Sequence, residues 1–208
     1  MTTDIANTRN GHGGNLSPVH VAVQSKRNMV AAQIAARELF AALGLNPGGE
    51  SLANTPARFA SGLAELLTPR EFDATTFPNE TGYRQLVIEC NIPFRSLCEH
   101  HMFPFSGTAH VGYLPGPRIL GLSKLARLVE HFAARPQVQE RLTDQVADWL
   151  QTHLAPEGTG VIMRAEHTCM TLRGARAQGT RTVTSAFTGS LQASADARRE
   201  FTTMIGMS

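Results

Sequence analysis

Apolar residues recur along this chain first at helical spacing and then at strand spacing. Helical spacing covers about residues 26–43 and 55–67, and Thr55-Pro56 is typical of a helix start. Four later segments alternate or are rich in branched apolar residues, which predicts strands. They lie at about residues 85–94, 107–114, 160–172 and 181–189. Three more helices are expected to begin near residues 123, 136 and 193.

This order predicts an α+β fold with a pair of N-terminal helices and a four-stranded, antiparallel sheet that has helices on one face. The edges of such a sheet have unpaired backbone groups, and pairing with neighbouring copies would satisfy them, so we expect an oligomer. Residues 1–22 lack periodicity and predict a flexible arm. Residues 23–70 form the helical region, and residues 71–208 form the domain with the candidate chemistry.

Composition narrows the classes of protein that fit this pattern. The chain has 208 residues, of which 42% are hydrophobic, and its formal net charge of +2 is too balanced for nonspecific binding to nucleic acid. No apolar run approaches membrane-spanning length. The 3 cysteines cannot form a complete set of disulfides, which favours a reduced, cytoplasmic protein. Cys90 lies in an apolar run and is expected to be a core residue.

The other two cysteines lie in clusters typical of metal ligands. Cys98 and His101 have the C-x-x-H spacing at which two side chains reach one zinc ion. His167 and Cys169 are two residues apart and would point to the same face if the strand continues through them. Three ligands and an open position indicate catalytic zinc, whereas a fourth ligand, His167 or His100, would indicate structural zinc. The spacing leaves both alternatives open.

Basic residues near one predicted helix start suggest an anion site. Ser123 and Lys124 open that helix, Arg127 lies on the same side, and Arg173 follows the second metal cluster. Each of these residues taken alone is better explained by an ordinary solvated surface. In the next helix, Glu140 lies off the apolar stripe, where its carboxylate either faces solvent or accepts hydrogen bonds from a ligand.

Four motifs taken together resemble the GTP cyclohydrolase I family, in the family's order and spacing. They are the segments 96–101 (SLCEHH), 121–127 (GLSKLAR) and 135–143 (RPQVQERLT), and His167-x-Cys169. The resemblance covers about residue 52 to the C-terminus. It implies the tunnelling fold (T-fold), in which pentamers form a toroidal barrel, two pentamers stack into a homodecamer, and the active sites lie at subunit interfaces.

The resemblance also implies roles for individual residues. Cys98, His101 and Cys169 correspond to the ligands of one Zn²⁺ per subunit, and His100 and His167 to the residues that transfer protons. Guanine recognition is implied for Val138, Gln139 and Glu140. Triphosphate binding is implied for Ser123, Lys124, Arg127, Arg173 and, from a neighbouring subunit, Arg58. Ser61 stands where family members often have a lysine, which removes one expected phosphate contact.

The implied reaction converts GTP and water to 7,8-dihydroneopterin triphosphate and formate, the first step of tetrahydrofolate and pterin biosynthesis. Three alternatives remain beside it. A zinc-dependent deaminase would need the H-x-E and P-C-x-x-C motifs, which this sequence lacks. A T-fold relative that reduces nitriles would use a cysteine nucleophile without zinc. A non-enzymatic, zinc-stabilised oligomer would use four protein ligands and would unfold when the metal is chelated.

Overall fold

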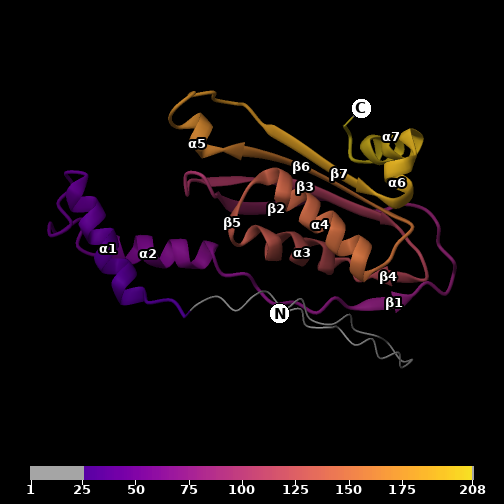
Figure 1. Ribbon diagram of the computed structural model, residues 1–208, viewed down its shortest axis with the longest axis horizontal. Helices are drawn as coiled ribbons and strands as arrows, with labels where there is room; N and C mark the ends of the chain where they lie inside the picture. The colour runs from indigo at the N-terminus through magenta and orange to yellow at the C-terminus, as the bar shows by residue number, and fades with distance from the viewer. Residues whose placement is uncertain (1–25, 208) are drawn as a thin grey trace, which may run out of the picture.

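A five-stranded sheet forms the centre of the computed structural model, which describes residues 26–207 (Figure 1). The strands run in the spatial order β5-β2-β3-β6-β7. Their bounds are β2 Val87–Cys98, β3 Pro104–Leu114, β5 Pro136–Gln137, β6 Gly158–His167 and β7 Thr182–Thr188. The four expected strands are antiparallel to their neighbours, and β5 adds a fifth, parallel strand beside β2. Sequence reasoning missed β5 because two residues are too few to show alternation.

A second, two-stranded sheet lies outside the four strands that were predicted. It pairs β1 (Thr76–Pro78) with β4 (Arg118–Leu120). The predicted arm of residues 1–22 lies outside the described residues. Between residues 26 and 207, no helix has the length and apolar character needed to cross a membrane.

Helices α3 (Ser123–Ala133) and α4 (Gln139–His153) cover one face of the main sheet. Each presents an apolar stripe at i, i+3, i+4 spacing, and the stripes face the buried side chains of β3 and β6. The stripe residues are Leu125, Leu128, Val129, Leu142, Val146 and Leu150, all at most 1% exposed. Burying one such side chain contributes roughly 1.5–3 kcal/mol, so this layer is the main source of stability.

The opposite face is covered in part by α6 (Gly189–Ala193) and α7 (Ala195–Met204), so the expectation of helices on one face only was wrong. β6 is buried on both faces, and its Ile162 packs into a separate core with Leu191 and Phe201. The Phe201 ring lies directly against β6, where a Cβ atom on Gly160 would be 2.8 Å from it. Glycine at this position therefore permits α7 to pack closely.

The N-terminal helices α1 (Met29–Ala42) and α2 (Thr55–Leu66) pack on each other beside the sheet domain (Figure 1). Phe40 and Phe59 meet edge to face with ring centroids 5.3 Å apart. The Asn28 side chain accepts a hydrogen bond from the Ala31 N–H and caps α1. The cap position of α2 is Asn54, and Thr55 is the first helical residue.

The two ends of the main sheet carry different parts of the chain. At one end β2 terminates at Cys98, β3 begins at Pro104 and β6 terminates at His167. At the other end the hydroxyl of Tyr113, near the end of β3, accepts a hydrogen bond of 2.8 Å from the Leu120 N–H, just before α3. The N-terminus of α3 therefore lies at the opposite end of the sheet from Cys98.

Two sequence predictions about cysteines were wrong. The strand that contains His167 ends there, and Cys169 lies on the short helix α5 (Thr168–Thr171). Cys90, expected in the core, is exposed because β2 has a register shift between Glu89 and Ile92. Asn91 in this bulge has φ 56°, and the extra residue changes the side-chain alternation of the strand.

The imidazole of His131 provides a test of the packing of α3. Its Nδ1–H donates to the Arg70 carbonyl at 3.0 Å, its Nε2 is buried without a partner among the described residues, and burial lowers its pKa below 6.5. The unfolded chain therefore binds a proton more readily than the folded chain. We expect the free energy of unfolding to be fully retained above pH 6.5 and to fall as the pH drops below it.

Urea unfolding of the wild type and of His131→Leu at pH 7.5 and pH 5.5 measures this effect. The variant should lose less stability between the two pH values than the wild type does. Equal losses in both proteins would contradict a contribution from His131.

Candidate active site

Three side chains from separate elements meet at the end of the sheet where β2 terminates. Cys98 is the last residue of β2, His101 lies in the following turn, and Cys169 lies on α5. Their ligand atoms all lie within 4.8 Å of one another. The turn is closed by a hydrogen bond of 2.7 Å from the Met102 N–H to the Cys98 carbonyl, and Met102 has φ 55°. This tight turn returns the His101 ring to the Cys98 thiol.

The donor set fits a zinc ion. Two sulfur atoms and one imidazole nitrogen are the ligands that zinc prefers over calcium or magnesium. Tetrahedral zinc with ordinary bond lengths separates a sulfur and a nitrogen ligand by about 3.6 Å. The Cys98 Sγ and His101 Nδ1 atoms are 3.7 Å apart. The chain therefore holds this pair at the spacing that a shared ion needs.

A divalent cation would also relieve an unfavourable pairing of the two thiols. Burial, and then the nearby charge of Cys98, raise the pKa of the Cys169 thiol, while Arg173 acts in the opposite direction. Since zinc binds the thiolate form, a bound cation would offset both effects. The positive charge of Arg173 therefore acts on the Cys169 thiol, four residues before it in the chain.

His167 lies beside the metal group but does not belong to it. Its ring stacks on Phe105, with centroids 4.5 Å apart and an angle of 6° between the planes. Its Nε2 is 2.8 Å from Oε1 of Gln139. Burial lowers the pKa of His167, and the negative charge of Glu140 acts in the opposite direction, so that carboxylate lies nearby. His167 is not one of the residues whose ligand atoms lie within 4.8 Å of one another.

His100 occupies a different environment on the exposed side of the turn. Its Nε2 is 3.8 Å from Oε1 of Glu99. Its ring meets His101 edge to face, with centroids 6.3 Å apart. Among residues 26–207, neither His100 nor His167 belongs to the group of side chains whose ligand atoms lie within 4.8 Å of one another. The structure thus favours three protein ligands over the four of a structural site.

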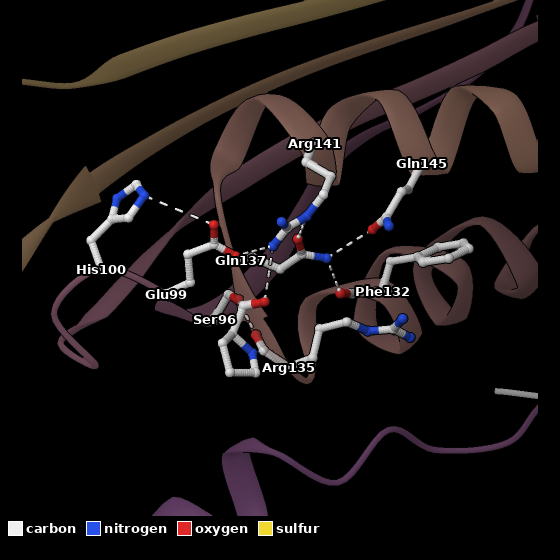
Figure 2. Close-up of polar contacts among 9 residues, drawn as sticks. Ser96, Glu99, His100, Phe132, Arg135, Gln137, Arg141 and Gln145 are labelled. Atoms are coloured by element: carbon white, nitrogen blue, oxygen red, sulfur yellow. Dashed lines mark hydrogen bonds and ion pairs between the residues drawn. The ribbon is translucent and has the colours of Figure 1, made fainter. Parts of the chain in front are cut away.

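A polar network connects the metal loop to the start of α4 (Figure 2). Arg141 pairs with the carboxylate of Glu99, and its Nε donates to Oε1 of Gln137 at 3.0 Å. The Gln137 side chain, fully buried, donates to the Phe132 carbonyl and to Oε1 of Gln145. The Arg141 hydrogen bond is the main reason that the pKa of Glu99 is lowered. Glu99 therefore stays ionised and holds the loop against α4.

The expected phosphate-binding residues do not all lie at this end of the sheet. Ser123, Lys124 and Arg127 lie in the first turns of α3, whose N-terminus is at the opposite end. Arg173 lies near Cys169, as described above. Arg58 lies on α2, where it lines a hollow of about 390 Å³ together with Arg95 of β2. One copy of the chain therefore does not bring the whole predicted set together.

The residues of the expected guanine site lie at the start of α4. Val138 precedes the helix, and Gln139 and Glu140 form its first turn. The Glu140 side chain is exposed, whereas Gln139 is only 1% exposed and its carboxamide points into the protein. The first backbone N–H groups of a helix have no intrahelical partner, so this turn offers donors next to a carboxylate acceptor.

Sequence reasoning missed Phe105, Arg141 and Thr184 as residues of the site. Phe105 stacks on His167 because the two are directly paired in the register of β3 and β6. Thr184 of β7 accepts a hydrogen bond from Gln139, 45 residues away in sequence. Pairings at this separation have no local sequence signal. A local signal was present only for Arg141, which lies next to Glu140 within the motif of residues 135–143.

Comparison with known proteins gives a consistent result. The sequence profile described as GTP cyclohydrolase I matches residues 32–206. GTP cyclohydrolase 1 of Thermobifida fusca is 49% identical over 171 residues, which cover 80% of this chain and 83% of that protein. GTP cyclohydrolase 1 of Aquifex aeolicus is 44% identical over 171 residues, covering 82% and 93% respectively. The enzyme of the same name from Brucella anthropi is 43% identical over 187 residues, covering 88% of each chain.

Among solved structures, the archaeosine synthase QueF-Like in the apo form covers 50% of this chain with 17% identity and a TM-score of 0.40. The sequence matches extend over the whole region that contains the metal group, His167 and the start of α4. On this evidence the chain belongs to the GTP cyclohydrolase I family.

Proposed function

We propose that this protein uses zinc to convert GTP and water to 7,8-dihydroneopterin triphosphate and formate. The observation that carries the proposal is the group of three metal ligands with His167 and Glu140 beside it, in a chain of the GTP cyclohydrolase I family. The reaction releases C8 of guanine as formate, opens the ribose and closes the pterin ring. It therefore needs activated water, proton transfer and a firmly held base.

Cys98, His101 and Cys169 would hold the zinc ion, which when bound supplies Lewis-acid activation of water. His167 and His100 are the proposed proton-transfer residues, because an imidazole exchanges protons near neutral pH. Their environments differ, since His167 is half-buried and stacked whereas His100 is exposed. This difference allows one to act at the enclosed part of the substrate and the other near solvent.

The start of α4 is the proposed guanine site. The ring N–H and the amino group of guanine are both donors, and a carboxylate such as that of Glu140 accepts from both. The free backbone N–H groups of the first turn, near Val138 and Gln139, suit the guanine carbonyl oxygen. Because the adjacent Gln139 is hydrogen-bonded to His167, a base held here would lie next to that imidazole.

A second copy of the chain would supply the cations for most of the triphosphate. Ser123, Lys124 and Arg127 combine side-chain donors, positive charge and the start of a helix, which suits phosphate. Because they lie at the far end of the sheet from the zinc ligands, they are proposed to serve the site of a neighbouring copy. Arg173 would contribute from the same copy as the zinc ligands, and Arg58 from a neighbour, with Ser61 adding no charge.

This arrangement accords with the T-fold assembly proposed for the chain, a toroidal decamer of two pentamers with active sites between copies. Side-by-side pairing of the open edges of the sheet would close such a ring. Cytoplasmic function is proposed because all three cysteines are free thiols. The product would enter the tetrahydrofolate and pterin pathways.

Removal of one zinc ligand tests the proposal most directly. Cys169→Ser should lose stoichiometric zinc and release no formate from GTP, because an alcohol at this position is a poor zinc ligand. Purified protein is incubated with GTP, with and without a chelator, and formate and pterin fluorescence are measured alongside metal analysis. Cys90→Ser is the matched control, since Cys90 is exposed and outside the metal group. Full turnover by Cys169→Ser would refute the zinc-dependent reaction.

Substitution of Glu140 tests recognition of the base. Glu140→Ala should weaken GTP binding by about 10- to 100-fold, the usual loss for hydrogen bonds to a charged group. Binding of inorganic triphosphate should change little, because the phosphates are held elsewhere. Titration calorimetry with both ligands measures the difference, and Asp144→Ala, on the next turn of α4, is the control. Equal losses for both ligands would exclude a guanine contact.

Mixing two inactive variants tests whether the site is shared between copies. Lys124→Ala and Cys169→Ser should each be inactive as pure oligomers. After joint unfolding and reassembly in equal amounts, about one quarter of the sites should contain both intact residues, if each site takes one from each copy. GTP turnover should then reappear at about that fraction.

Mixing Lys124→Ala with the double variant Lys124→Ala/Cys169→Ser is the negative control, because no intact Lys124 is present. Recovery should be absent there. The mixture of Lys124→Ala with Cys169→Ser could stay inactive even though native mass spectrometry shows mixed oligomers. That result would show that Lys124 and Cys169 do not meet across copies.

A further inference from the structure

The Gln139 carboxamide is buried where α4 meets β6 and β7, and both of its polar atoms have partners. Its Nε2 lies 3.2 Å from the Met163 carbonyl, 3.1 Å from the Thr182 carbonyl and 3.1 Å from the Thr184 hydroxyl. Its Oε1 lies 2.8 Å from Nε2 of His167. With only 1% of the residue exposed, the side chain has no free edge to offer to a substrate.

These partners fix which end of the amide is the nitrogen. Backbone carbonyls only accept hydrogen bonds, so the atom that faces Met163 and Thr182 must be the NH₂ group. The oxygen must then face His167. Because an amide oxygen only accepts, the neutral His167 ring has to carry its proton on Nε2.

A pair of hydroxyl groups supports the same orientation. The Thr143 hydroxyl donates its proton to the backbone carbonyl of Gln139 at 2.8 Å. The Thr143 oxygen can then only accept from the Thr184 hydroxyl, which lies 2.6 Å away. With its proton used in this way, Thr184 Oγ1 accepts from the Gln139 amide at 3.1 Å. Every hydrogen bond in the series from Thr143 through Thr184 and Gln139 to His167 then has a consistent direction. A reversed amide would place oxygen against oxygen at two carbonyls.

The plane of the His167 ring is fixed independently by Phe105. The two rings are nearly parallel, and Phe105 is 0% exposed within the core. Stacking restricts the tilt of the imidazole, and the Gln139 hydrogen bond restricts its rotation within the plane. Within residues 26–207, no hydrogen bond involves Nδ1 of His167, so this is the nitrogen left for a substrate.

We propose that Gln139 is a positioning residue, which holds His167 as the Nε2–H tautomer so that Nδ1 exchanges the proton with the substrate. This inference rests on the proposed function of the same site. It differs from direct recognition of guanine by the Gln139 side chain. The side chain acts through His167, whereas guanine meets Glu140 and the backbone of the first turn of α4.

The tautomer is measured directly in zinc-loaded protein labelled with ¹⁵N-histidine. Magic-angle-spinning ¹⁵N spectra distinguish a protonated from a bare ring nitrogen, and the His167 signals are those lost in His167→Ala. The wild type should show a protonated Nε2 and a bare Nδ1. Gln139→Met, which has similar length but no acceptor, should show a second set of signals from the other tautomer. Gln151→Met, the same substitution near the other end of α4, should leave the spectrum unchanged.

Steady-state kinetics with GTP separates positioning from binding. Gln139→Met should lower kcat by about 10- to 100-fold, the usual effect of losing a residue that orients an active-site imidazole, and change KM little. If Gln139→Met does not fold, Thr184→Val removes one anchor of the same amide and should give a smaller effect of the same kind.

Unchanged His167 signals in Gln139→Met would overturn the proposal, as would a raised KM with an unaltered kcat, which indicates a direct substrate contact. Failure of the proposed function itself would appear differently, as absence of GTP turnover in the wild type. The spectra do not depend on turnover and would still decide whether Gln139 sets the tautomer.

Discussion

The register between β3 and β6 is the constraint on which the candidate active site depends. In this register Phe105 lies opposite His167, which puts the imidazole on the buried face beside Gln139. The pairing also puts the start of β3 and the end of β6 beside the end of β2 at Cys98. The turn with His101 and the helix with Cys169 therefore meet. A shift of one residue would turn His167 to the other face and separate these groups.

Hydrogen bonds restrain both elements that flank the metal ligands, and the buried carboxamides of Gln139 and Gln137 anchor them. On one side Gln139 joins α4 to β6, β7 and His167. On the other side Arg141, Glu99 and the buried Gln137 join the same helix to the metal loop (Figure 2). The first turn of α4 therefore fixes both the loop that carries His101 and the ring of His167. Buried polar networks whose members are all satisfied hold one arrangement in this way.

The sequence predicted most elements and all three members of the metal group, because their signals are local. Cys98 and His101 are three residues apart, and the amphipathic stripes of α3 and α4 repeat every three or four residues. It did not predict the end of β6 at His167, since the apolar character of the chain continues into α5. Nor did it predict the exposure of Cys90, because a bulge is decided by the partner strand as well as by the chain itself.

The sequence by itself determined the family, the types of ligand and the presence of a helix start rich in cations. Only the tertiary structure decided that these parts occupy two ends of one sheet, with Lys124 far from Cys98, because the direction of each strand is set by pairing over long separations. It also decided that Gln139 faces inward to His167. A glutamine in a first helical turn has no preferred side in the sequence, and packing against β6 and β7 chose the buried one.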